Sequence, residues 1–258
     1  MISYYYTFLN KHRYLDFNML KFQHNIQHIW WDFGETLYKT LPTFYEKKTK
    51  RFIELYASII GQTVTPQIEQ ECLQAYEEHG SRCMVFMSLG KDKDFWLRNR
   101  NISVKDYIVP DESIKQTFYK LTQRFPPHSL FSGKKRNDTK EMLRYIGIDI
   151  NIFAHIITND ELHYPKPNSE GFNKILQLSN ISAQEILYIG DRIKADLMPA
   201  KKAGMRTALM SLNKKNEPNE EEINYVDYII KHPAEILDAT IAVATRKHRD
   251  SDPQTEGF

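Results

Sequence analysis

Short apolar runs alternate with helical stretches along most of the chain, and this alternation limits the possible folds more than any other feature of the sequence. Such an order is typical of a parallel β-sheet whose strands are joined by helices. We therefore expect an α/β fold with a doubly wound parallel sheet. The expected strands are 29–33, 129–132, 155–158, 186–189, 207–210 and 228–230. The expected helices between them include 139–146, 169–178 and 194–203.

A mostly helical segment separates the first two expected strands, and its apolar residues fall at helical spacing. We interpret residues 41–125 as an inserted helical cap domain, and residues 26–40 together with 126–240 as the core domain. Three residues of the insertion are candidates for substrate contact, although packing and solvent exposure explain them equally well: Trp96, Arg98 and Arg100.

The two ends of the chain lie outside this pattern. Residues 1–25 precede the first strand and are either a packed extension or a consequence of the chosen start site, since Met19 could also initiate translation. Residues 241–258 carry charge, Pro and Gly without periodicity, so we expect a disordered tail. The polar run 213–224 is expected to be a surface loop.

The length and composition suit a compact core domain with an inserted one: 258 residues, 41% hydrophobic and 26% charged. A net charge of +2 is too small to indicate a nucleic-acid partner, which normally requires a basic stripe. The basic clusters 47–51, 134–136 and 246–249 are scattered along the chain. We interpret them as solvated faces or tails, with a polyanion site as the remote alternative.

The two cysteines, Cys72 and Cys83, form no Cys-x-x-Cys pattern and have no matching histidine set, so neither a zinc site nor a disulfide framework is expected. No apolar run approaches the length of a transmembrane helix, and the first 25 residues lack the apolar region of a secretory signal. We expect a cytoplasmic protein without a membrane partner. The oligomeric state does not follow from the sequence.

Polar residues follow the expected strands in an order that indicates one shared site. The first apolar run ends at Asp32, whose carboxylate is a candidate nucleophile at the carboxyl end of a strand, where open α/β sheets bind ligands. Four further polar residues follow later strands or lie in loops: Ser132, Lys166, Asp191 and Asp196.

Each of these residues also has an ordinary structural explanation. Aspartates are common in turns, a serine after a strand often caps a helix, and Lys166 between two prolines could be a surface residue. Thr158 is a rival to Ser132 for the hydroxyl group of the site. Its position shortly before the lysine fits the strand that precedes the lysine loop, so Ser132 is the preferred candidate.

The polar segments resemble the four motifs of the haloacid dehalogenase superfamily, in its helical-cap form, over roughly residues 28–237. Residues 190–205 are the most family-like stretch. The resemblance implies a magnesium-dependent phosphatase that acts on a small phosphorylated metabolite through an aspartyl-phosphate. The implied nucleophile is Asp32, and the implied ligands of Mg²⁺ are Asp32, Asp191 and the backbone carbonyl of Gly34.

The resemblance also implies roles for the remaining residues. Ser132 would donate a hydrogen bond to a phosphoryl oxygen, Lys166 would offset negative charge, and Asp196 would hold Lys166 or a metal-bound water. One departure is important: Gly34 stands where the family has a second aspartate, which usually acts as the general acid and base. That group contributes roughly 10²- to 10⁴-fold in typical enzymes. Glu35 is a weak candidate to replace it, because neighbouring side chains point in different directions.

These features leave three functional hypotheses. The first is a hydrolase that acts as a phosphatase, with a substrate whose leaving group needs little protonation. The second, motivated by Gly34, is a weakly active or inactive protein that binds phosphorylated ligands or partners. The third is a 2-haloacid dehalogenase, which needs no metal, so the retained pair of Asp191 and Asp196 argues against it. A loose similarity of the cap to nucleotidase-type members does not specify a substrate.

Overall fold

The computed structural model describes residues 17–20, 26–108, 110–124, 127–211, 218–236 and 241–244. Its centre is one eight-stranded sheet with the order β1-β8-β7-β6-β5-β2-β3-β4. The six strands from β7 to β4 are parallel, and β8 and β1 continue one edge in antiparallel fashion. The strands are β1 (Phe17–Leu20), β2 (His28–Asp32), β3 (His128–Ser132), β4 (Phe153–Thr158), β5 (Ile186–Gly190), β6 (Arg206–Met210), β7 (Tyr228–Ile230) and β8 (Ile241–Ala244).

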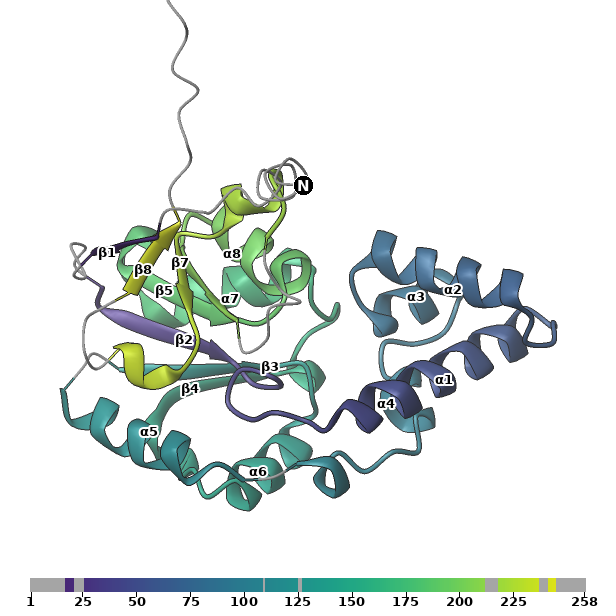
Figure 1. Cartoon of the computed structure of the whole chain (residues 1–258), viewed down its shortest axis with the longest axis horizontal. Coiled ribbons are helices and arrows are strands. Elements are labelled where there is room, and N and C mark those ends of the chain that lie inside the picture. Colours follow the sequence, from purple (N-terminus) through teal and green to yellow (C-terminus); the bar gives the residue numbers. More distant parts are fainter. Residues whose placement is uncertain are drawn as a thin grey trace, which may run out of the picture.

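Helices cover both faces of this sheet, which confirms the doubly wound α/β fold (Figure 1). Successive side chains of a strand point to opposite faces, so the neighbours Trp31 and Trp30 belong to two different apolar clusters. Trp31 packs on the side of α5 (Glu112–Arg124) and α6 (Arg136–Tyr145). Trp30 packs on the side of α7 (Ser169–Ser179) and α8 (Met198–Lys202). Because β2 is buried on both faces, its sequence is an uninterrupted apolar run rather than an alternating one.

The strand order reverses at β2. The chain proceeds from β2 to β3 and β4 in one direction, and from β5 to β6 and β7 on the other side of β2. In open α/β sheets, ligands bind beyond the carboxyl ends of the strands at such a reversal. Asp32 and Ser132 are the last residues of β2 and β3, and Asp191 directly follows β5. The topology therefore brings these three residues to the same edge of the sheet.

Four helices form a unit with an apolar cluster of its own, beyond the carboxyl ends of the strands (Figure 1). We call it the α1–α4 unit: α1 (Pro42–Ile59), α2 (Pro66–His79), α3 (Arg82–Ser88) and α4 (Phe95–Asn99). The sequence interpretation extended the cap to residue 125, but α5 packs on the sheet. The ring of Phe118 on α5 lies 4.9 Å from that of Trp31.

The ends of α2 illustrate how local sequence sets helix boundaries. The side chain of Thr65 accepts a hydrogen bond from the Ile68 amide, which satisfies a free donor of the first turn, and Pro66 occupies the first helical position. Gly80 ends the helix with a φ of 69°, a left-handed conformation that favours glycine.

Two short strands were not expected from the sequence. Residues 17–20 of the predicted extension and residues 241–244 of the predicted tail pair with each other as β1 and β8. Residues 1–16, 21–25 and 245–258 lie outside the described residues, as do residues 213–217 of the polar run 213–224. In the described part of the chain, no helix combines the length and apolar character needed to cross a membrane.

Candidate active site

Three buried aspartates converge at the reversal of the strand order. Asp32, Asp191 and Asp196 each offer one oxygen atom, and these atoms all lie within 4.8 Å of one another. Burial raises the pKa of Asp191 well above its usual range, and the neighbouring charge of Asp32 adds to this effect. Carboxylate oxygens are the ligands that hard divalent cations prefer, so this cluster fits such an ion.

A turn of π-helix, Ile193–Leu197, brings Asp196 back toward the other two carboxylates. The carbonyl of Arg192 accepts from the amides of Asp196 at 2.9 Å and Leu197 at 3.3 Å, which widens the first turn after β5. Burial raises the pKa of Asp196, but attraction to Lys166 and Arg192 outweighs it, so this pKa lies below its usual value. Asp196 is therefore the most strongly ionised carboxylate of the cluster.

Lys166 links the cluster to the sheet. Its Nζ lies 2.6 Å from Oδ1 of Asp32, 2.8 Å from Oδ1 of Asp196, 2.7 Å from the Tyr188 hydroxyl and 3.0 Å from the Phe131 carbonyl. Only 4% of Lys166 is exposed, so its position between two prolines does not make it a surface residue. Burial raises the pKa of Asp32, and the positive charge of Lys166 opposes that rise.

Ser132 is buried at the end of β3 and lines the same pocket as Asp32. Its Oγ accepts hydrogen bonds from the Lys134 amide at 3.1 Å and from the Thr139 hydroxyl at 2.9 Å. Because both contacts use the oxygen as acceptor, the hydroxyl proton of Ser132 can be donated to a bound ligand. The rival Thr158 donates its hydroxyl to Glu161 at 2.9 Å, one strand further from β2.

Gly34 lines the pocket, and the side chain of Tyr38 lies beside it. A Cβ atom at Gly34 would lie 3.3 Å from the hydroxyl oxygen of Tyr38, which is tighter than ordinary contact. Burial raises the pKa of Tyr38 well above its usual value, and the charges of Asp32 and Glu35 add to this rise. A neutral hydroxyl therefore lies beside Gly34.

Glu35 does not occupy that place. Its φ of 63° is left-handed, and its Oε1 accepts from the amide of Thr40 at 3.1 Å and from the Thr40 hydroxyl at 2.5 Å. These bonds hold the carboxylate across the loop after β2. The geometry therefore gives no support to Glu35 as the replacement for the missing aspartate.

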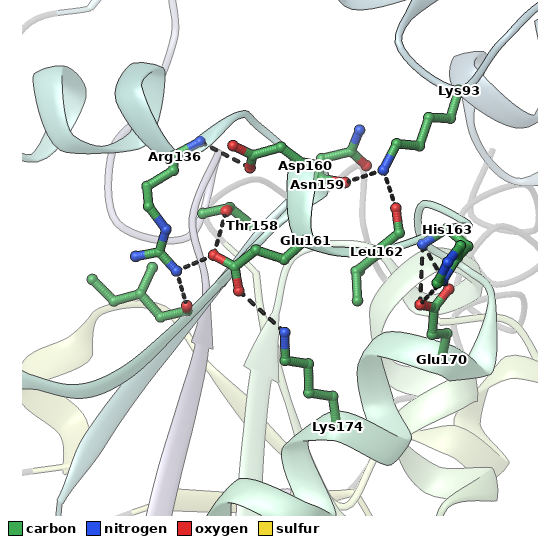
Figure 2. A network of polar contacts seen from close by, with 11 residues as sticks. Lys93, Arg136, Thr158, Asn159, Asp160, Glu161, Leu162, His163, Glu170 and Lys174 are labelled. Atoms are coloured by element: carbon green, nitrogen blue, oxygen red, sulfur yellow. Dashed lines mark hydrogen bonds and ion pairs between the residues drawn. The ribbon is translucent and has the colours of Figure 1, made fainter.

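The site opens into a cavity of about 400 Å³ between the α1–α4 unit and the core. Contacts from the loop before α4 connect the two parts. Lys93 donates to the carbonyls of Asn159, at 3.2 Å, and Leu162, and Asp94 lies 3.0 Å from Lys135 (Figure 2 shows the Lys93 contacts). These contacts place the α1–α4 unit over the carboxylates.

The three residues of the insertion that were candidates for substrate contact differ in position. Trp96 and Arg100 line the cavity, whereas Arg98 pairs with Asp92 on the surface at 2.5 Å. Several cations of the lining were not among the sequence candidates: Lys48, Arg82, Lys134 and Arg192. For Lys48 the sequence contained a signal in the helical spacing. Lys48 lies four residues after Phe44 and four before Phe52, which places it on the buried face of α1.

Curated relatives match parts of the chain. A glyceraldehyde 3-phosphate phosphatase of Methanocaldococcus jannaschii is 35% identical over 86 residues, which cover 33% of this chain and 37% of the relative. The pyrophosphatase PpaX of Bacillus cereus is 27% identical over 115 residues, covering 44% of this chain and 52% of the relative. The matches thus span about half or less of these relatives' lengths.

Solved structures share the fold over a longer stretch. YfnB of Bacillus subtilis, in a structure bound to magnesium, superposes with a TM-score of 0.56 at 18% identity, covering 83% of this chain and 98% of YfnB. Residues 29–210, from β2 to the end of β6, match the family model described as haloacid dehalogenase-like hydrolase. Since that match includes most of the sheet and every residue of the carboxylate cluster, the chain belongs to the haloacid dehalogenase-like hydrolase family.

Proposed function

We propose that this protein is a magnesium-dependent phosphatase that hydrolyses small phosphate monoesters through covalent attack by Asp32. The observation that carries the proposal is the geometry of Lys166, which joins Asp32 and Asp196 beside Asp191 at a pocket that Asp32, Lys166 and Asp191 line. The names of the curated relatives, one a phosphatase and one a pyrophosphatase, support chemistry at phosphorus.

The residues present suit a magnesium ion. Asp32 and Asp191 would hold it with side-chain oxygens, and Gly34 would do so with its backbone carbonyl, which does not depend on the missing side chain. When bound, the ion neutralises charge on the phosphoryl group and thereby lowers the barrier to attack by an anionic nucleophile.

The chain's own residues supply the remaining steps. Asp32 attacks phosphorus with a carboxylate oxygen and displaces the ester oxygen, and water then releases phosphate from the aspartyl intermediate. The positive charge of Lys166 favours the ionised form of Asp32 against the effect of burial, and Asp196 holds Lys166 in place. Ser132 donates its free proton to a phosphoryl oxygen, which stabilises developing negative charge.

Gly34 supports a second candidate function, that of a protein that binds phosphate esters but turns them over slowly. No carboxylate is available at this position to protonate an alkoxide leaving group, and the neutral hydroxyl of Tyr38 lies beside it. Turnover is therefore expected to depend strongly on how good the leaving group is. A dehalogenase is disfavoured, because the acidic cluster suits a metal that such enzymes do not need.

Phosphate release from 4-nitrophenyl phosphate tests the proposal, since this ester needs little leaving-group protonation. We expect magnesium to stimulate release by at least about 100-fold, because the ion neutralises charge at the transferring group. Excess chelator should abolish release, and re-addition of magnesium should restore it. Phosphate release that is indifferent to both treatments would contradict the proposal, whereas tight binding of inorganic phosphate without release would favour the second candidate.

Restoring the carboxylate with Gly34→Asp should raise the hydrolysis of alkyl phosphates by up to about 100-fold and that of 4-nitrophenyl phosphate much less. The new Cβ presses on the Tyr38 hydroxyl at 3.3 Å, so we expect a larger gain in the double variant Gly34→Asp/Tyr38→Phe, which removes that oxygen. The measurement is kcat for both ester classes. Gly34→Ala is the control for steric effects, and an equal gain for both classes would mean that leaving-group protonation is not the limiting step.

A further inference from the structure

Four cations line the cavity without a carboxylate partner. Lys48 comes from α1, Arg82 from α3, Arg100 from the end of α4 and Lys134 from the loop after β3. Within the described ranges, no carboxylate pairs with any of these side chains. We call this set the cationic wall. It includes three residues from the α1–α4 unit and one from the core, so it spans the cavity.

The cationic wall is not needed to balance the catalytic carboxylates. Lys166 pairs with Asp32 and Asp196, and Nε of Arg192 lies 3.3 Å from Asp196 and 3.9 Å from Asp191. Together with one divalent ion, Lys166 and Arg192 balance the charges of the three carboxylates and of Glu35, which also lines the cavity. A single phosphate dianion then adds two negative charges, which two of the four cations would offset. The cationic wall is an excess of positive charge beyond what one phosphate group requires.

Like charges held together in this way raise the free energy of the empty cavity. Burial lowers the pKa of Lys134 to about 7, and the positive charge of Arg100 contributes to this shift. Burial, followed by the charges of Arg82 and Lys134, lowers the pKa of Lys48 well below its usual value. An anion bound between these side chains would remove the repulsion, so the arrangement favours an anionic occupant.

Arg82 is held in place by aromatic side chains. Its guanidinium lies 4.7 Å from the centre of the Tyr76 ring and 5.8 Å from that of Trp96, and both rings line the cavity. Its Nε is buried and has no hydrogen-bond partner among the described residues. A fixed guanidinium with an unused donor is suited to recognise an oxyanion, because little side-chain entropy is lost on binding.

We propose that the cationic wall binds a second oxyanion group of the substrate, a phosphate or a carboxylate, in addition to the phosphate that Asp32 attacks. The substrate class is then a small phosphate ester that carries a second anionic group, which we call a doubly anionic ester. A cavity of about 400 Å³ has room for such a molecule. This inference rests on the proposed phosphatase function, and it concerns the part of the pocket that the reaction itself does not use.

Matched substrates test the inference in the unaltered chain with magnesium. We expect kcat/KM for propane-1,3-diyl bisphosphate and for 3-phosphonooxypropanoate to exceed that for 3-hydroxypropyl phosphate by about 10- to 100-fold, the range expected for one to two charged hydrogen bonds. A comparison of the two doubly anionic esters shows whether the second group that the protein prefers is a phosphate or a carboxylate. Equal values for all three esters would overturn the inference.

Two pairs of variants locate the effect, because the chain offers an exposed cation close in sequence to each of two residues of the cationic wall. Lys48→Gln and Arg100→Gln should reduce the preference for the doubly anionic esters by about tenfold each. Lys47→Gln and Arg98→Gln are the controls, since Lys47 bonds to the Tyr107 hydroxyl and Arg98 to Asp92, both on the exposed side. A similar loss of preference in the control variants would contradict a specific site.

Binding of phosphonates, which are not hydrolysed, separates this inference from the proposed function. By calorimetry, propane-1,3-diphosphonate should bind the unaltered chain about 10- to 100-fold more tightly than propylphosphonate, and Arg100→Gln should reduce that difference. Selective binding without phosphate release from any ester would refute the phosphatase and retain the second oxyanion site. Equal binding of the two phosphonates would refute the second site even in an active phosphatase.

Discussion

Asp32→Asn is expected to lower magnesium-stimulated phosphate release by more than about 10³-fold, the loss typical of removing a covalent nucleophile. The amide is neutral and a poor nucleophile toward phosphorus. It also contributes a weaker ligand to the ion that Asp32 and Asp191 would share. The measurement is kcat for 4-nitrophenyl phosphate at saturating magnesium, with the fold of the variant checked by circular dichroism.

Trapping the intermediate distinguishes a nucleophile from a metal ligand. After rapid denaturation in acid during turnover, the unaltered chain should retain covalently bound phosphate, and the Asp32→Asn chain should retain none. Asp106→Asn is a matched control, because Asp106 is exposed and does not line the cavity. An Asp32→Asn variant with more than a tenth of the original rate, or with the same covalent label, would refute the proposed attack.

Lys166→Met is expected to lower the free energy of unfolding by about 3 to 5 kcal/mol in the absence of divalent ions. Lys166 is 4% exposed and lies 2.6 Å and 2.8 Å from the carboxylates of Asp32 and Asp196. Its removal leaves buried Asp32 without its ion-pair partner and Asp196 with Arg192 alone, and the methionine side chain fills the space but cannot compensate the charge. Urea denaturation at pH 7 with a chelator measures the loss.

Two comparisons make this prediction specific. Lys174→Met removes a partly exposed ion pair to Glu161, at 3.2 Å, and should cost less than about 1 kcal/mol. The double variant Lys166→Met/Asp196→Asn should be more stable than Lys166→Met alone, because one uncompensated charge is removed with the lysine. Equal costs for Lys166→Met and Lys174→Met would mean that the buried network does not contribute to stability as described.

The expected strands of the parallel sheet were predictable because their signals are local. The six runs expected as strands correspond to β2 through β7, with ends that differ by at most two residues. The convergence of Asp32, Lys166, Asp191 and Asp196 was also predictable, since each follows a strand or lies in a loop at the carboxyl edge of the sheet. Their proposed roles follow from the family resemblance and are tested by the experiments above.

Neighbouring residues show why other parts were not predictable. Lys47 is exposed and Lys48 lines the cavity, although both belong to one basic cluster of the sequence. Arg98 pairs on the surface, whereas Arg100 faces the pocket. The occupation of the space beside Gly34 by Tyr38 likewise depends on how the loop after β2 closes. None of these differences appears in composition or charge.

The amino-acid sequence alone determined the α/β class, the positions of the core strands along the chain and the set of polar residues at their carboxyl ends, because hydrophobic periodicity and strand ends are properties of short segments. Only the tertiary structure decided that α5 covers the sheet, that β1 pairs with β8, and that the cationic wall faces inward. Those features depend on which distant segment packs against a given surface. Whether a charged side chain faces a cavity, or a strand finds a partner, depends on a contact between distant segments, and no single segment of the sequence encodes it.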